Sequence, residues 1–189
     1  NEVVVGHDIK SKGIVLQTTD GGKSFAPKVI GANEAFRHLT FIDQNVGWAV
    51  ASSNDNPWYL KRTVDGGDSW KDVQLPTCPD GLQWMWLSKL VFPVPLKGWA
   101  AGACGDPEYE LDNMSNKAVI IKTANAGSSW EFDPEGEGKG GYLDIDFAGE
   151  HWGFAVGTFA HIMAFTDGTD WVPPDVENDI MEGDQDVLA

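Results

Sequence analysis

One short segment recurs four times along the chain, and this repetition restricts the possible folds more than any other feature of the sequence. Each copy follows residues typical of a β-strand, makes a tight turn, and closes on an aromatic residue. The copies are TTDGGKSF at 18–25, TVDGGDSW at 63–70, TANAGSSW at 123–130 and a shortened FTDGTDW at 165–171. A segment repeated in this way is a building unit, so it describes architecture before it describes chemistry.

A second shared element lies upstream of the turn in three of the units. A phenylalanine is followed six residues later by glycine and then at once by another aromatic residue, as in Phe41, Gly47, Trp48; Phe92, Gly98, Trp99; and Phe147, Gly153, Phe154. The segments that end at these phenylalanines read as first strands, and the small apolar residues after each glycine read as second strands. The third strand runs to the recurring turn and the fourth begins at its aromatic residue. Each unit is therefore predicted to be a four-stranded antiparallel meander.

Repeated four-stranded meanders are typical of a β-propeller, in which every blade packs against its neighbours. We therefore predict an all-β propeller over 1–174, with complete blades at 36–75, 86–134 and 141–174. Residues 1–31 supply a partial blade that lacks its first strand, and the set either closes as a small ring or belongs to a larger one. The acidic tail 175–189 lacks the blade pattern and is predicted to be disordered, with pairing as the closing strand of the first blade as the alternative.

The charge of the chain argues against two classes of partner. Its 29 acidic and 13 basic residues give a formal net charge of −16, which repels the phosphates of nucleic acids and anionic membrane surfaces. No apolar run reaches the ~18–20 residues that span a bilayer, so no transmembrane segment is predicted.

Two cysteines and a glycosylation triplet favour a location outside the cytoplasm. Cys78 and Cys104 lie in loop-like contexts, in or beside the insertions around 76–85 and 105–116 that lengthen the third unit. An even pair in such loops predicts a disulfide bond, and disulfides persist in oxidising compartments. Asn113 begins an N-glycosylation triplet, which adds slight support for an extracytoplasmic location.

The recurring turn follows the pattern Thr/Ser-x-Asp-x-Gly-x-x-Trp/Phe, which resembles the Asp-box, or bacterial neuraminidase repeat. The third copy has asparagine in place of aspartate, and the fourth is one residue short. The residues that carry the pattern are Asp20, Gly22 and Phe25; Asp65, Gly67 and Trp70; Asn125, Gly127 and Trp130; and Asp167 and Trp171. Together with the second strands, residues 3–172 look most like the propellers of photosystem II stability and assembly factors and their secreted relatives. The resemblance implies that the Asp-boxes are structural fasteners at the periphery, and that the protein is secreted, periplasmic or in a thylakoid lumen.

Two functional hypotheses follow from this resemblance. The leading one is a non-enzymatic propeller that acts as a protein-interaction or complex-assembly factor. The alternative is a glycan-binding protein or a glycoside hydrolase of the Asp-box type. A complete sialidase site is excluded within this chain, because such enzymes hold the substrate carboxylate with three arginines and the chain has only Arg37 and Arg62.

Charged residues at matching positions of the predicted first strands form one candidate site. Asp144 and Asp146 are two residues apart on a strand and so point to one side. His38 and Lys89 occupy the corresponding places on the preceding first strands, and first strands line the central channel of a propeller. We expect His38, Lys89 and Asp144 to form a solvated lining with a salt link. The alternative is a hydrolase that uses Asp144 and Asp146 as acid and base.

Aromatic residues that the repeat does not explain form a second candidate site. Trp58, Trp84, Trp86 and Tyr109 lie in or beside the inserted loops. Large amphipathic rings of this kind anchor protein partners or stack on sugars, and burial within the insertions is the other reading. We expect these four residues, with His38 and Lys89 on the channel side, to be the binding residues for a protein partner.

No cofactor or metal is expected from the motifs. The acid-rich loops lack the residue order of an EF-hand, and the four histidines lack the spacing of metal ligands. No helix follows the paired glycines to hold a phosphate group. A structural calcium ion in the acidic loops is the alternative.

Overall fold

The computed structural model describes residues 2–7, 13–31, 34–53, 59–106, 115–166 and 168–174. Within these residues the chain is built from β-strands and one short 3-10 turn, η1 (Pro79–Gly81). None of the described residues belongs to a helix that could cross a membrane.

The strands form four antiparallel sheets, each a simple meander. The first sheet has three strands, β1 (Glu2–His7), β2 (Gly13–Thr18) and β3 (Ala26–Gly31). The second contains β4 (Glu34–Phe41), β5 (Gly47–Ser53), β6 (Tyr59–Thr63) and β7 (Lys71–Val73). The third contains β8 (Trp84–Val94), β9 (Lys97–Gly105), β10 (Lys117–Thr123) and β11 (Glu131–Lys139), and the fourth contains β12 (Tyr142–Phe147), β13 (Gly153–Gly157), β14 (Ile162–Thr166) and β15 (Asp170–Val172).

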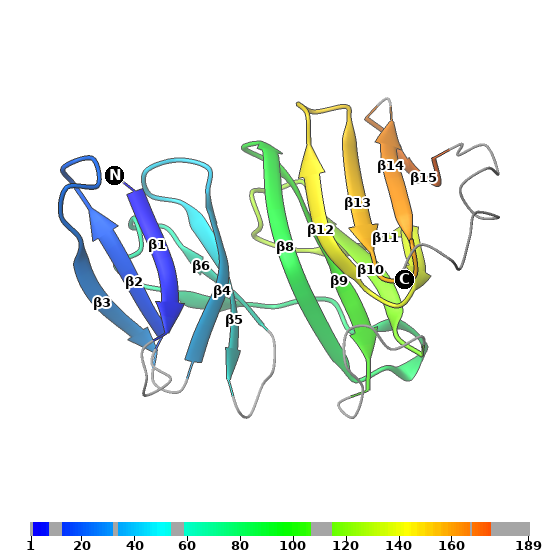
Figure 1. Ribbon diagram of the computed structural model, residues 1–189, viewed down its shortest axis with the longest axis horizontal. Helices are drawn as coiled ribbons and strands as arrows, with labels where there is room; N and C mark the ends of the chain where they lie inside the picture. The colour runs from blue at the N-terminus through cyan, green and yellow to red at the C-terminus, as the bar shows by residue number, and fades with distance from the viewer. Residues whose placement is uncertain are drawn as a thin grey trace, which may run out of the picture.

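The four sheets are the blades of a β-propeller and follow one another in chain order (Figure 1). Strand β4 contacts β1 on one side and β8 on the other, and β8 in turn contacts β12. Strand β2 ends at Thr18, where the first recurring turn begins, just as β6 ends at Thr63. Strand β1 therefore occupies a second-strand place, and the first blade lacks its first strand. The predicted fold class is confirmed.

The glycine of the Phe-Gly-aromatic motif lies directly beneath the phenylalanine ring. A Cβ atom added to Gly47 would lie 2.7 Å from the ring of Phe41, and one added to Gly153 would lie 2.8 Å from the ring of Phe147. Both distances are shorter than real side chains tolerate, and the third motif is equally tight. Only glycine allows the ring to lie flat against the neighbouring strand.

The aromatic residue after each glycine joins one blade to the next. Trp48 stacks on Phe92 of the following blade with ring centroids 4.2 Å apart, and Trp99 stacks on Phe147 at 4.6 Å. Both tryptophans are buried. Phe154 holds the same place in the last described blade, where 57% of its surface is exposed. The same repeat position is thus core in two blades and surface in the third.

The recurring turns are closed by backbone N–H groups that donate to a threonine hydroxyl and to a carboxylate or amide oxygen. Thr63 Oγ1 accepts the N–H of Gly67 at 2.9 Å, and Asp65 Oδ1 accepts the N–H of Ser69 at 2.8 Å. The hydroxyl of Ser69 also donates to Asp65, and this bond, with the Ser69 backbone N–H and the Thr63 hydroxyl, lowers the pKa of Asp65 far below its ordinary value. We call such a turn a corner.

The other two corners in the described residues repeat this geometry. At 18–25 Asp20 accepts from the backbone and hydroxyl of Ser24, and its pKa is lowered in the same way. At 123–130 the amide of Asn125 replaces the carboxylate, accepting from the N–H of Ser129 at 3.0 Å and donating to its hydroxyl at 2.8 Å. The fourth copy includes Asp167, which lies outside the described residues.

The blade contacts predict a large difference between equivalent aromatic residues. Trp99→Ala removes a buried ring from between two blades and is expected to lower the free energy of unfolding by about 3–5 kcal/mol. Phe154→Ala removes an exposed ring and is expected to cost less than about 1 kcal/mol. Urea unfolding followed by circular dichroism measures both. Equal losses would contradict the blade order.

The corners predict an acid-dependent contribution to stability. The pKa of Asp65 is lower in the folded state than in the unfolded chain, so its contribution is full above the unfolded value of about 3.9 and is lost as the pH falls below it. Asp65→Asn is expected to lower the urea midpoint at neutral pH and to reduce the further loss between about pH 5 and pH 2. Asn125→Asp, which adds a carboxylate at the matching place, is expected to increase that acid loss. Parallel pH curves for all three proteins would contradict the assignment.

Candidate functional site: a cleft between the second and third blades

The repeat is interrupted where the second blade joins the third. Strands β3 and β4 are joined by two residues, 32–33, and strands β11 and β12 by two residues, 140–141. The connection from β7 to β8 has ten residues, 74–83. Insertions into a repeat protein fall on its loops and often build the binding face. Residues 74–83 are therefore a candidate part of a binding surface.

The insertion is fixed to the third blade by a covalent bond and an ion pair. Cys78 forms a disulfide with Cys104 on β9, with their Cα atoms 5.8 Å apart. Asp80 accepts from Lys117 Nζ on β10 at 3.0 Å. The insertion is therefore attached to the third blade at Cys78 and at Asp80 of η1, which gives the neighbouring surface a fixed shape.

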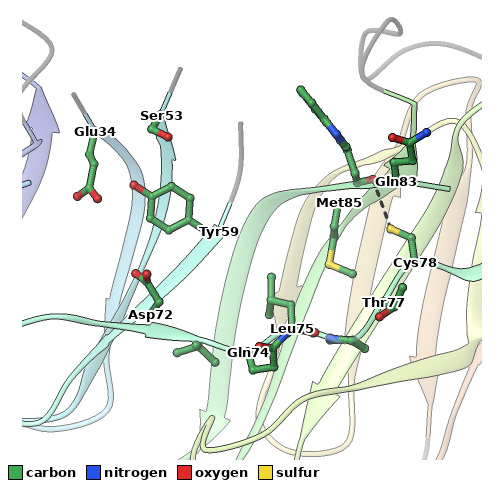
Figure 2. A pocket seen from close by; sticks show the side chains of 13 residues that line it. Glu34, Ser53, Tyr59, Asp72, Gln74, Leu75, Thr77, Cys78, Gln83 and Met85 are labelled. Atoms are coloured by element: carbon green, nitrogen blue, oxygen red, sulfur yellow. Dashed lines mark hydrogen bonds between the residues drawn. The ribbon is translucent and has the colours of Figure 1, made fainter. Parts of the chain in front are cut away.

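A cleft of about 680 Å³ lies between this insertion and the second blade (Figure 2). Strand β6 begins at the cleft with Tyr59 and ends at the corner with Thr63, so the cleft and that corner lie at opposite ends of the same strand. The lining residues are Glu34, Ser53, Tyr59, Asp72, Val73, Gln74, Leu75, Pro76, Thr77, Cys78, Gln83, Trp84 and Met85.

One wall of the cleft is acidic and comes from the second blade. Figure 2 shows Glu34, Tyr59 and Asp72 together on this side. Behind them, Lys61 Nζ lies 3.2 Å from Glu34 Oε1 and 2.9 Å from Asp72 Oδ1. The ammonium also lies 5.2 Å from the centre of the Tyr59 ring. A single buried cation therefore organises two carboxylates and a phenol.

The electrostatics of this wall raise the pKa of both its lysine and its tyrosine. Burial lowers the pKa of Lys61, but hydrogen bonds to Asp72 and Glu34 outweigh it and the pKa is raised overall. Burial, followed by the hydrogen bond and charge of Glu34, raises the pKa of Tyr59. Near neutral pH the Tyr59 phenol therefore stays protonated and the Lys61 ammonium stays charged.

The opposite wall is mainly apolar and comes from the insertion and the start of β8. Leu75 and Met85 face the open space from this side, with Gln74, Thr77 and Gln83 at its margins (Figure 2). Methionine adapts its shape to different ligands because its side chain is unbranched and polarisable. The cleft thus presents charge on one side and an adaptable apolar surface on the other.

The predicted aromatic contact residues fall in different environments. Trp84 lines the cleft and is partly exposed. Trp86, two residues further along β8, is only 8% exposed, and its ring lies against Gly105 on β9. For Trp86 the alternative prediction, burial, therefore applies. Trp86 is not part of an accessible contact surface. Trp58 and Tyr109 lie outside the described residues.

The predicted first-strand cluster is brought together where β4, β8 and β12 adjoin. Lys89 Nζ pairs with Asp144 Oδ1 at 2.8 Å, and His38 Nε2 lies 3.0 Å from the carbonyl oxygen of Leu90. Burial, with the positive charge of Lys89, lowers the pKa of His38. A neutral imidazole that donates from Nε2 to this carbonyl fits that geometry.

The state of Asp144 does not match that of a general acid. Partial burial raises the pKa of Asp144, but the hydrogen bond from Lys89, the N–H of Ile145 and nearby positive charge lower it overall. A glycosidase acid needs a raised pKa so that it holds a proton near neutral pH. Asp144 is instead an ion-paired carboxylate, and Asp146 is an exposed residue on the same strand.

The acidic wall was not evident from the sequence. Glu34, Tyr59 and Asp72 come from three strands of one blade, and no motif links them. The available signal was the inserted segment between the second and third units, which locates the cleft on one side only. No group of three or more His, Cys, Asp or Glu residues suited to a metal occurs in the part of the chain that the structure describes.

Comparison with known proteins supports the fold. No protein-family profile and no curated protein sequence matches the chain. Among solved structures, it is similar to YCF48 from Cyanidioschyzon merolae, with 16% identity and a TM-score of 0.60 over 89% of this chain and 52% of that one. It is also similar to YCF48 bound to D1 peptide, with 18% identity and a TM-score of 0.57 over 93% of this chain and 49% of that one. The chain thus spans about half the length of these structures, and the likeness is one of fold, a β-propeller.

The disulfide predicts a measurable loss on its removal. Replacing both cysteines, Cys78→Ser with Cys104→Ser, is expected to lower the free energy of unfolding by about 2–4 kcal/mol, because the bond closes a loop with a sequence separation of 26. Guanidinium unfolding measures the loss, and wild-type protein under reducing conditions serves as the control. A double variant as stable as the oxidised wild type would contradict a structural role for the bond.

Proposed function

We propose that this chain is a non-enzymatic propeller of the Asp-box type, acting as a protein-interaction or complex-assembly factor that binds a polypeptide segment in the cleft. The observation that carries the proposal is the cleft itself, which is built where the repeat is broken. A ten-residue insertion held by a disulfide forms one wall, and a charged network on the neighbouring blade forms the other.

Three further observations support the proposal. The volume of the cleft falls within the usual range for ligand sites, about 300–1,000 Å³. One of the similar structures is that of YCF48 bound to D1 peptide, a propeller with a peptide ligand. The threonine-aspartate corners are closed by side-chain hydrogen bonds within each turn, which supports a structural role for them.

The proposal places the protein in an oxidising, extracytoplasmic compartment and includes no cofactor. A disulfide that joins an insertion to the core of a blade supports such a location. The alternative of a glycoside hydrolase gains no support from Asp144, whose lowered pKa disfavours a role as acid.

The proposal predicts that peptides selected from a random library will bind in the cleft. Dodecapeptides displayed on phage and selected on the immobilised protein are expected to bind the wild type and to lose at least about tenfold in affinity with Met85→Ala, which removes part of the apolar wall. Phe154→Ala, an exposed apolar residue of the fourth blade, is the matched control and is expected to bind them unchanged. Fluorescence anisotropy of labelled peptides measures the dissociation constants.

Two outcomes would overturn this function. Selected peptides that bind wild type and Met85→Ala equally would place binding elsewhere. A protein that yields no peptides but binds oligosaccharides on a glycan array would favour the glycan alternative.

A further inference from the structure

We infer that the cleft recognises a peptide through one basic side chain, arginine or lysine, flanked by apolar residues. This inference rests on the proposed function and adds the chemistry of the ligand. The charges on one wall, the apolar surface on the other and the polar groups at the margins support it.

The open charge in the cleft is negative. The described residues that line the cleft include two acids, Glu34 and Asp72, and no lysine, arginine or histidine. Lys61 lies behind this wall and is nearly buried, with 11% of its side chain exposed. It pairs with Oδ1 of Asp72, while 74% of the Asp72 side chain remains exposed. A ligand cation can therefore reach Asp72 without displacing Lys61.

The two walls together match the two ends of a long basic side chain. Lysine and arginine carry an aliphatic stem below a cationic head. A head at Asp72 places the stem toward the open space that Met85 and Leu75 border from the opposite wall (Figure 2). An acidic side chain would be repelled by the carboxylates of this wall, and an apolar one would make no hydrogen bond to the exposed part of Asp72.

The margins of the cleft favour a peptide over a free amine. Gln74, Thr77 and Gln83 carry amide and hydroxyl groups at separate places around the cleft (Figure 2). Such groups can pair with the N–H and C=O groups of an extended chain. Trp84 adds a partly exposed ring suited to an apolar residue next to the basic one.

The experiment uses three peptides that differ at one side chain. Ac-Leu-Arg-Leu-NH2 carries the charge, Ac-Leu-Cit-Leu-NH2 replaces arginine by neutral citrulline of nearly the same shape, and Ac-Leu-Glu-Leu-NH2 reverses the charge. The protein is labelled with [methyl-13C]methionine, which gives four methyl signals because the chain has four methionines. The Met85 signal is assigned by its loss in Met85→Leu.

The arginine peptide is expected to shift the Met85 signal in a saturable manner. The citrulline peptide is expected to bind at least about fivefold more weakly, and the glutamate peptide more weakly still. Asp72→Asn is expected to remove most of the difference in affinity between the arginine and citrulline peptides. Asp72→Glu is expected to restore this difference. Asp170→Asn is the matched control. It removes an exposed carboxylate on β15 and is expected to leave the difference in affinity unchanged.

Each contrary result has a distinct meaning. Equal binding of arginine and citrulline peptides at Met85, or a preference that survives Asp72→Asn, overturns the charge inference while the peptide-binding function stands. No shift at Met85 with any of the three, although phage-selected peptides do bind there, also overturns it. Failure of both the three peptides and the phage selection overturns the proposed function.

Discussion

The packing of successive blades depends on the stacking of one phenylalanine ring against the tryptophan of the preceding blade. Phe92 lies flat over Gly98, stacks on Trp48 of the preceding blade, and meets the edge of Trp130 from its own corner. The following blade repeats this arrangement around Phe147. Strand pairing, blade stacking and corner closure therefore meet at one side chain, which explains why phenylalanine, glycine and tryptophan recur at fixed spacing.

The sequence predicted the propeller because these contacts are local in register and repeated. A spacing of six residues from phenylalanine to glycine specifies a hairpin in which the ring meets the glycine on the paired strand. The three-stranded first blade was predictable for the same reason, since β1 stands at the same distance from its corner as β5 does. Periodic features of this kind survive in a single sequence.

The cleft could be predicted only in part, because it depends on what the repeat does not contain. The insertion was visible as extra length, but its partner wall combines Glu34, Lys61 and Asp72 from three different strands. Lys61 and Asp72 are paired directly across β6 and β7, but no motif marks them, and Glu34 joins them from β4, which is not a neighbour of β6 in the sheet. The burial of Trp86 could not be predicted either, because the residues before the first-strand motif lie outside the periodic pattern. Trp84 and Trp86 share a face of β8, but Trp86 packs against Gly105 of β9, whereas Trp84, at the start of the strand, lines the cleft.

The asparagine in the third corner separates the blades in their response to acid. Asp20 and Asp65 fasten the first two blades with ionised groups, whereas Asn125 fastens the third with a neutral amide that does not titrate. Protonation therefore loosens the first two fasteners and spares the third. Among the three corners that the structure describes in full, the one in the blade with the disulfide is therefore indifferent to pH, so acidification would loosen the corners of the two amino-terminal blades before it.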